Sequence, residues 1–258
     1  MATELSPKVL IDDIVRHYRP CYQQEFLPQV EGKAFEVQLL YRPSAVLVDL
    51  GGGISATNGA LARMGMQVNV FDLFNTYWEQ RDVRTDVAHE IQVLRDAGVR
   101  LIEGDLSTCD LRDLFAINSV DVVSSFHVVE HLHHSPKRLL ESALAVLKPG
   151  GRLVIEVPNA ANLRKRAALL LGRTNYLPFL NYFRRDRYFG HIREYTVQEL
   201  RELAAELGIL QYRIFGKNYY GGERLERLPF KLGKLVDIAL QTRPALCGSL
   251  FVEMFKTA

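Results

Sequence analysis

The chain contains 258 residues, of which 24% are charged and 48% are hydrophobic, and its formal net charge is +2. These values predict one large α/β domain, without a second full domain. They exclude nucleic-acid binding through overall charge, so any electrostatic preference must be local.

The first 44 residues predict an N-terminal helical cap. A helix begins at Ser6-Pro7, and its apolar residues recur at helical spacing: Leu10, Ile11, Ile14 and Val15. Arg19-Pro20 ends this helix. A second, short helix is expected at residues 32–40, and residues 41–44 form a turn before the first strand.

Apolar runs and helical patterns alternate after this cap. Strands are expected at residues 45–50, 67–71, 100–103, 120–126 and 152–157. The helices between them are expected at residues 57–64, 77–96 and 135–147, with a short one at 111–115. Ser135-Pro136 begins the helix at 135–147, and Pro149-Gly150-Gly151 stops it. This alternation predicts βαβ units with right-handed crossovers and a buried parallel sheet.

The C-terminal third has a different pattern. Residues 196–207 predict a helix, with Thr196 and Glu199 in a capping box. Two apolar runs follow at residues 209–215 and 249–255, without a convincing βα crossover between them. We therefore expect an antiparallel pair of strands to finish the sheet.

The most informative segment joins the first strand to the helix after it. Asp49-Leu50 is followed by Gly51, Gly52 and Gly53, and glycine lets the backbone turn with positive φ and approach a ligand closely. The glycines and Asp72 also fit the dinucleotide fingerprint of an NAD-dependent oxidoreductase. Asp49 argues against that alternative, because its carboxylate would repel a pyrophosphate and attract a cationic ligand.

Over most of residues 45–258 the chain resembles the class I S-adenosylmethionine-dependent methyltransferases. Residues 49–55 are similar to the family's first motif, with Ser55 where a third glycine is usual. Gly104-Asp105-Leu106 is similar to its adenine-recognition turn, and residues 147–153 are similar to its turn into the fifth strand. The resemblance implies a Rossmann-like, doubly wound α/β fold with a seven-stranded, mostly parallel sheet whose last strand is antiparallel.

The resemblance also implies which residues bind the cofactor, S-adenosylmethionine. Asp49 and the loop amides would hold the methionine moiety, and Asp72 would take both ribose hydroxyls. Asp105 would accept a hydrogen bond from the adenine amine while a neighbouring side chain packs on the ring. The full expected set is Asp49, Gly51, Gly52, Gly53, Asp72, Leu73, Asp105, Leu106 and His127. A simple turn role remains the alternative for Asp72 and Asp105.

Residues 127–132 resemble a subgroup of this family whose fourth strand ends in Val-x-Glu-His-Leu. The segment also matches the H-x-x-E-H pattern of zinc proteases. That chemistry needs both histidines on one helical face, whereas His127 follows a strand, so no metal site is predicted. His131 should lie at the carboxyl ends of the strands and is the first candidate for a general base, with a structural or cofactor-shell role as the alternative.

Residues 159–194 form a long insertion that predicts a basic lid over the active site. Up to Arg193 the only acid is Asp186, and the basic residues are Arg164, Lys165, Arg166, Arg173, Arg184, Arg185, Arg187 and Arg193. Aromatic residues and the leucines 169–171 lie among them. This composition favours an anionic or ring-bearing acceptor, including a lipid-linked one at an anionic membrane surface. A solvated helix face and single-stranded RNA binding are the alternatives.

The end of this insertion carries a second set of candidates. Residues 190–196 resemble a segment of the same subgroup that precedes the lid-closing helix, often in enzymes that modify saccharides, quinones or other secondary metabolites. His191 is therefore the second candidate for a general base. Glu194 and Tyr195 are acceptor-side candidates, and a structural role for each of the three remains open.

The sequence thus predicts an S-adenosylmethionine-dependent methyltransferase that O-methylates a small-molecule, saccharide or lipid-linked acceptor, with no DNA partner. The alternatives are an NAD-dependent oxidoreductase and a non-catalytic scaffold of the same fold. We expect a cytoplasmic location, because the N-terminus has no signal-peptide pattern and no apolar run approaches the ~20 residues of a membrane span. Cys21, Cys109 and Cys247 suit reduced thiols there.

Overall fold

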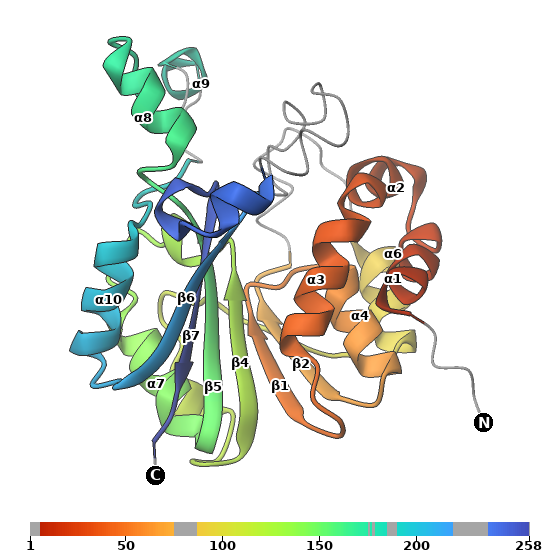
Figure 1. The fold of residues 1–258 in the computed structure, drawn as a ribbon. Coiled ribbons are helices and arrows are strands. Elements are labelled where there is room, and N and C mark those ends of the chain that lie inside the picture. Colours follow the sequence, from red (N-terminus) through yellow and green to blue (C-terminus); the bar gives the residue numbers. More distant parts are fainter. Residues whose placement is uncertain are drawn as a thin grey trace.

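Seven strands form the sheet at the centre of the computed structural model, which describes residues 6–74, 87–174, 176, 179–184, 190–218 and 237–257 (Figure 1). The strand order is β3-β2-β1-β4-β5-β7-β6. Their bounds are β1 Val46–Leu50, β2 Gln67–Asp72, β3 Arg100–Glu103, β4 Val120–Phe126, β5 Leu147–Pro158, β6 Gln211–Lys217 and β7 Ser249–Phe255. Neighbouring strands from β3 to β5 are parallel, and β7 is antiparallel to both β5 and β6. The predicted fold class is confirmed.

The strands form where apolar and β-branched residues run together, because such side chains pack well on a pleated, buried surface. β1 and β4 pair in register through Leu47 and Val122, and both side chains are buried. β5 begins at Leu147, five residues before the predicted start. The pairing of β4 with β5 shifts register between Val120 and Val122, and Gly150 has φ +77°, so the predicted turn is an irregular entry into the strand.

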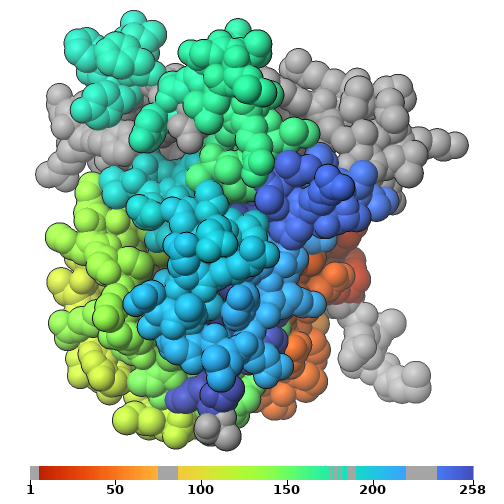
Figure 2. All heavy atoms as spheres, turned by 60° about the vertical axis from the view of Figure 1, so that its left-hand side comes forward, coloured from red at the N-terminus to blue at the C-terminus, as the bar shows by residue number. Residues whose placement is uncertain are grey.

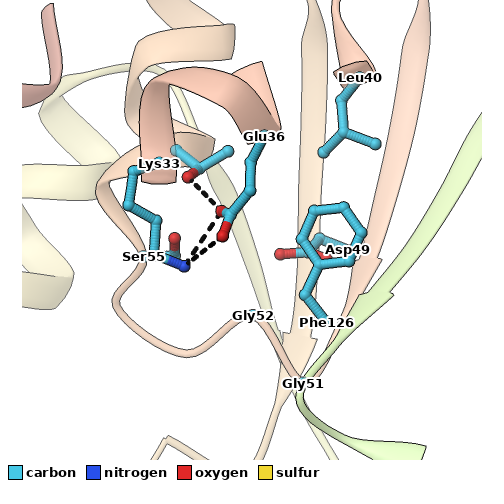
Figure 3. A pocket seen from close by; sticks show the side chains of 9 residues that line it. Lys33, Glu36, Leu40, Asp49, Gly51, Gly52, Ser55 and Phe126 are labelled. Atoms are coloured by element: carbon cyan, nitrogen blue, oxygen red, sulfur yellow. Dashed lines mark hydrogen bonds and ion pairs between the residues drawn. The ribbon is translucent and has the colours of Figure 1, made fainter. Parts of the chain in front are cut away.

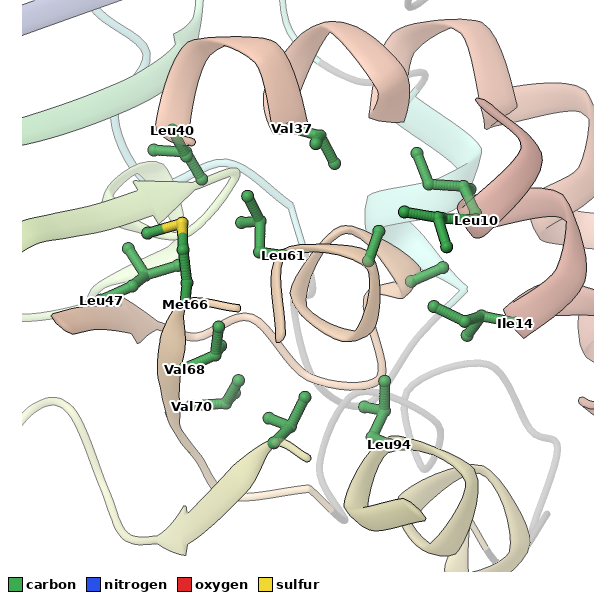
Figure 4. Packing of buried hydrophobic residues seen from close by; sticks show 14 of the residues in the cluster. Leu10, Ile14, Val37, Leu40, Leu47, Leu61, Met66, Val68, Val70 and Leu94 are labelled. Carbon is green, nitrogen blue, oxygen red and sulfur yellow. The ribbon is translucent and has the colours of Figure 1, made fainter. Parts of the chain in front are cut away.

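Helices from the N-terminal part of the chain cover one face of the sheet (Figure 1). These are α1 Pro7–Arg16, α2 Pro20–Phe26, α3 Val30–Leu40, α4 Ala56–Arg63 and α6 Ala88–Asp96. Leu10 and Ile14 of α1, Val37 of α3 and Leu61 of α4 meet in one buried cluster with residues of β1 and β2 (Figure 4). The helices of residues 1–44 therefore share a hydrophobic core with the sheet.

The opposite face is covered by α7 Lys137–Val146 and α10 Val197–Glu206 (Figure 1). Leu140 and Leu200 are fully buried in a second cluster with residues of β4, β5 and β7. Thr196 caps α10 as predicted, because its side chain accepts from the Glu199 amide and Glu199 accepts in return.

Three other expectations differ from the structure. α2 was not predicted, although Pro20 occupies the first turn of a new helix just after α1 ends. Residues 111–115 contain a 3₁₀ turn, η2 Leu111–Asp113, and no longer helix. The described part of the helix predicted at 77–96 is α6, and its predicted first half lies outside the described residues.

The strand order changes direction between β1 and β4, and ligands of open α/β sheets bind at the carboxyl ends of strands on either side of such a point. The inserted residues that follow β5 contain α8 Leu163–Leu170 and α9 Phe179–Phe183, which stand above this edge of the sheet (Figures 1 and 2). In the part of the chain that the structure describes, no helix is long and apolar enough to cross a membrane.

Candidate functional site

The glycine loop that follows β1 is a backbone cradle that side chains would fill. Gly51 has φ +75° and Gly53 has φ +50°, values that favour glycine. A Cβ atom on Gly51 would overlap the side chain of Val128, and one on Gly52 would overlap the carboxylate of Asp49. The amide of Gly51 donates to the Phe71 carbonyl at 2.8 Å, which joins the loop to β2. The glycines are therefore required by the geometry of the loop itself.

Asp49 lies at the base of this loop and is 6% exposed. Its Oδ1 accepts from the Ser124 hydroxyl at 2.6 Å, and its Oδ2 accepts from the Asn58 amide at 2.7 Å. Burial raises the pKa of Asp49, and the two hydrogen bonds oppose that rise. Asn58 Oδ1 is buried and accepts no hydrogen bond from the described residues. The loop thus presents a fixed carboxylate and a spare buried acceptor.

Helix α3 lies against the loop and closes a small cavity of about 40 Å³ (Figure 3). Glu36 points into the space between helix and loop and is 1% exposed. It accepts from Lys33 Nζ at 2.9 Å and from the Thr57 hydroxyl at 2.7 Å. The sequence analysis missed this contribution from α3. The sequence signal for it is a glutamate in α3 on the helix turn after Lys33.

Asp72 ends β2 beside the same loop. Its Oδ2 accepts from the Gly53 amide at 3.0 Å and its Oδ1 accepts from the Phe74 amide at 2.7 Å. Burial raises the pKa of Asp72, and these backbone donors oppose the rise. Leu73 lines a separate cavity that it shares with Phe74 and Glu103. Two predicted cofactor residues, Asp72 and Gly53, are thus in direct contact.

Asp105 and Leu106 lie in the turn after β3. Asp105 is exposed, and its Oδ1 accepts from the Ser107 amide at 2.8 Å, a contact typical of a turn residue, and adenine recognition by Asp105 stays a prediction. Leu106 is half-buried and packs against the second core cluster. The turn must be tight, because a Cβ on Gly104 would overlap the Phe71 ring.

His127 follows β4 with φ +57° and lies between two buried carboxylates. Its Nε2 is 2.7 Å from Glu156 Oε2, and its Nδ1 is 3.6 Å from Glu130 Oε1. Burial alone would lower the pKa of His127, but the two carboxylates outweigh it and raise that pKa to about 10. Glu156 was missed in the sequence, where its signal is a single acid inside the apolar run of β5.

The two candidate bases come together. The imidazole centroids of His131 and His191 are 5.0 Å apart, with an interplanar angle of 70°. His131 Nδ1 lies 3.3 Å from the Gly190 carbonyl, and His191 Nδ1 lies 2.8 Å from Glu194 Oε1. Partial burial lowers the pKa of His131, which favours its neutral form near pH 7.

Backbone hydrogen bonds hold the segment of His191 against η3 Val129–His131. The amides of Ile192 and Arg193 both donate to the Glu130 carbonyl, at 2.7 and 3.2 Å. The insertion also closes on itself, because Asn159 and Tyr195 form a parallel bridge at the end of β5. The start and end of the lid are therefore adjacent.

The described lid carries an exposed apolar surface as well as basic residues. The side chains of α8, α9 and their flanks that stand in solvent are Leu163, Leu169, Leu170, Leu171, Tyr176, Phe179, Leu180, Tyr182 and Phe183. Arg164, Arg173 and Arg184 are exposed beside them. Lys165 forms an ion pair with Glu194, which ties α8 to the segment of His191. Arg185 and Arg187 lie outside the described residues.

A family model described as "Methyltransferase domain" matches residues 16–209, more than half of the chain. Among curated proteins, none matches the sequence at a significant level.

Solved structures share the fold at low sequence identity. A methyltransferase of Archaeoglobus fulgidus, titled SAM-dependent, has a TM-score of 0.57 and 16% identity, over 92% of this chain and 100% of its own. A Thermotoga maritima protein titled a SAM-dependent methyltransferase and possible histamine N-methyltransferase has a TM-score of 0.55 and 15% identity, over 96% and 99%. Phosphoethanolamine N-methyltransferase 2 of Haemonchus contortus, solved with S-adenosyl-L-methionine, has a TM-score of 0.54 and 15% identity, over 88% and 53%.

Proposed function

The chain belongs to the methyltransferase domain family and is an S-adenosylmethionine-dependent methyltransferase, and we propose that it methylates a hydroxyl oxygen of a small-molecule, saccharide or lipid-linked acceptor. The observation that supports an oxygen acceptor best is the pair of imidazoles, His131 and His191, after the carboxyl end of β4. Methyl transfer to an alcohol requires removal of a proton, and the transfer to an amine bound in its neutral form does not require a side-chain base in the same way.

The chain's own residues fit the cofactor. Asp49 and the buried acceptor Asn58 Oδ1 suit an ammonium group, the glycine loop leaves room for close approach, and the Asp72 carboxylate suits a diol. When bound, S-adenosylmethionine supplies a methyl carbon activated by a sulfonium leaving group. The protein therefore has to orient the acceptor and exclude water more than activate the methyl group.

His131 and His191 are the groups that act on the hydroxyl proton. Glu194 orients His191 through its Nδ1, and the Gly190 carbonyl does the same for His131. An imidazole whose Nδ1–H is engaged in this way carries its lone pair on Nε2. Loss of either imidazole is expected to lower the turnover number more than it lowers the affinity for the cofactor.

A lipid-linked acceptor is supported by the lid. Leu170 is 89% exposed and Leu171 is 72% exposed, and arginines lie close by in the chain. Exposed leucines and aromatics with flanking arginines are the composition of a helix that lies on an anionic membrane surface. We place the acceptor's lipid portion against α8 and α9 in this proposal.

A second candidate function is N-methylation of an amine. Glu130 is completely buried and both of its oxygens lack a hydrogen bond from the described residues, so its carboxylate is a suitable acceptor for the N–H groups of an amine bound in its neutral form. Two of the structural neighbours are titled, one of them as a possibility, as N-methyltransferases. A screen of hydroxyl and amine acceptors with isotopically labelled cofactor, followed by mass spectrometry of the product, separates the two functions.

The cofactor site has its own test. Asp72→Ala removes the carboxylate that both fixes the loop and would bind the ribose, so calorimetry should show S-adenosylmethionine binding weakened by at least about tenfold. The matched control is Asp96→Ala, an exposed acid at the end of α6, which should bind as the wild type does. Absence of cofactor binding in the wild-type protein contradicts the proposal.

A further inference from the structure

Glu130, His131 and His191 bring three possible metal-ligand atoms together. One carboxylate oxygen and one nitrogen of each imidazole all lie within 4.8 Å of one another. Glu130 and His131 come from the turn after β4, and His191 comes from the far end of the lid insertion. Such convergence of two imidazoles and a carboxylate is the donor set of many divalent-cation sites.

The carboxylate of Glu130 is the strongest sign of a cation site. Glu130 is 0% exposed, and neither oxygen accepts a hydrogen bond from the described residues. The nitrogens recorded nearest to Oε1 are His127 Nδ1 at 3.6 Å and His131 Nε2 at 4.0 Å. The imidazole of His127, whose pKa the carboxylates raise, offsets part of the cost of burying this carboxylate, and a cation bound by Glu130, His131 and His191 would lower that cost further.

Both imidazoles are oriented as metal ligands usually are. Metal-binding histidines donate their second ring N–H to a carboxylate or a backbone carbonyl, which fixes the tautomer. Here Nδ1 of His191 lies 2.8 Å from Glu194 Oε1, and Nδ1 of His131 lies 3.3 Å from the Gly190 carbonyl. In these tautomers the coordinating lone pair is on Nε2, the nitrogen of His131 that faces Glu130.

The backbone holds the three ligands in place without a metal. The Glu130 carbonyl accepts from the amides of Ile192 and Arg193, so the η3 turn and the segment of His191 cannot separate freely. Lys165 pairs with Glu194 and steadies the partner of His191. A site built in this way costs little further ordering when a cation binds.

We propose that Glu130, His131 and His191 bind one divalent first-row transition-metal ion, such as Mn²⁺, Co²⁺ or Zn²⁺, and that this ion binds the acceptor's hydroxyl group. Three protein ligands leave coordination positions open, and His131 is 46% exposed, so an acceptor oxygen has access. The use of the ion in catalysis rests on the proposed O-methylation, in which His131 and His191 would then act on the hydroxyl through the ion that they bind and not as free bases. The binding of the ion does not depend on it.

The chemistry balances without a further reactant. A hydroxyl bound to a divalent cation loses its proton more easily, and the proton leaves to bulk water. The oxygen electron pair forms the new bond to the methyl carbon, and the carbon–sulfur bond breaks with its electron pair left on sulfur. The ion is neither oxidised nor reduced.

This site differs from the zinc-protease pattern that the sequence contains. In that pattern His127 and His131 would be the ligands, with Glu130 as the base. In the structure His127 lies against Glu156. The two histidines of the proposed metal site are therefore His131 and His191.

The test is metal titration of the full chain after treatment with a chelator. Co²⁺ is added while visible absorption is recorded, and Mn²⁺ binding is followed by loss of the electron paramagnetic resonance signal of the free ion. We expect one saturable site per chain. His191→Ala, His131→Ala and Glu130→Gln should each weaken binding by at least about tenfold, and Glu194→Gln should weaken it by about 10–100-fold through the orientation of His191.

The matched control is His134→Ala, which removes an exposed imidazole close to His131 in the chain and should leave metal binding unchanged. Thermal melting of each variant shows whether it folds. If Glu130→Gln does not fold, His191→Ala still tests the site. Absence of saturable binding, or equal binding by the wild type and folded His191→Ala, overturns the proposal.

Calorimetry with S-adenosylmethionine on the chelator-treated chain separates this proposal from the proposed function. Metal binding without cofactor binding means that the proposed function fails while the site stands. Cofactor binding and O-methylation that persist at full rate in chelator, without metal binding, mean that the site fails while the function stands.

Discussion

Asp49 and Asp72 are residues of the candidate site that the sequence could predict, because each lies in or ends an apolar strand whose carboxyl end reaches the edge where such sheets bind ligands. Glu156 could not be predicted in the same way. Its role depends on the parallel register that pairs Phe126 with Glu156 and so brings His127 to its carboxylate. Register between distant strands is a property of the whole sheet. A local pattern shows that an acid is present and does not show what it faces.

The three cysteines are expected to react at different rates. Cys21 is exposed, whereas burial, followed by the charges of Asp110 and Asp113, raises the pKa of the Cys109 thiol to about 11. At pH 8 only about a thousandth of such a thiol is thiolate, the reactive form. Alkylation followed by mass spectrometry should therefore modify Cys21 first, and modification of Cys109 should accelerate as pH rises toward 11.

The control for this prediction is Cys21→Ser, which should remove the rapid phase and leave the slow one. Rapid modification of Cys109 at pH 8 would contradict the raised pKa of its thiol. Cys247 is completely buried, and we expect it to react only when the protein unfolds.

At the scale of elements, the strands and the capped helices were predictable to within a few residues because burial gives them a periodic pattern. Three helices were not predicted for two different reasons. Arg19-Pro20 predicts the end of the first helix, but proline in a first turn also begins a helix, and in α2 it does so. α8 and α9 bury few side chains, so no apolar stripe marks them.

The exposed leucines of the lid predict that the protein binds anionic membranes. The full chain should bind vesicles that contain phosphatidylglycerol in a sedimentation assay. Replacement of Leu169, Leu170 and Leu171 by glutamine should weaken that binding by at least about tenfold, because burial of an exposed leucine contributes roughly 1.5 kcal/mol or more.

Leu210→Gln is the matched control for the lid variant. Leu210 is also a leucine in solvent, 88% exposed, but it precedes β6 and does not belong to the lid. Vesicle binding that both variants weaken equally, or that the wild type lacks, would leave the lid without a membrane role.

For the whole molecule, the direction of each strand followed from the alternation of helices and strands, while the packing of residues 1–44 did not. The sequence predicts a helical cap there, and it does not show that α1 and α3 supply core residues on one face of the sheet. The boundary at residue 44 stays a prediction. The amphipathic pattern of α1 shows which of its sides is buried, and it does not show which element it packs against.

A buried ion pair joins this N-terminal segment to the rest of the molecule. Glu90 of α6 is 0% exposed and accepts from the Arg19 guanidinium at 2.7 and 3.1 Å and from the Arg19 amide at 3.0 Å. Burial raises the pKa of Glu90, but the hydrogen bonds from Arg19 outweigh it, and the net pKa is lowered. The stabilisation is therefore complete above the unfolded-state pKa of about 4.3 and is lost as pH falls through the lower folded-state pKa.

Arg19→Ala leaves the Glu90 carboxylate buried without its cation and should destabilise the protein by about 3 kcal/mol at pH 7. Denaturant unfolding measures this difference, which should shrink below pH 4. The matched control is Lys137→Ala, which breaks an exposed ion pair with Glu141 and should change stability by less than about 0.5 kcal/mol. An equal effect of both substitutions would contradict a structural role for Glu90.

The bridge between Asn159 and Tyr195 has a consequence for how such a protein can change. Since the inserted segment leaves and rejoins the sheet at neighbouring points, its central portion can be lengthened, shortened or exchanged with little effect on the folding of the sheet. The glycine loop and the turn of Glu130 lie outside that portion. A chimaera that carries another lid between residues 163 and 184 would thus retain the cofactor site while acquiring a different choice of acceptor.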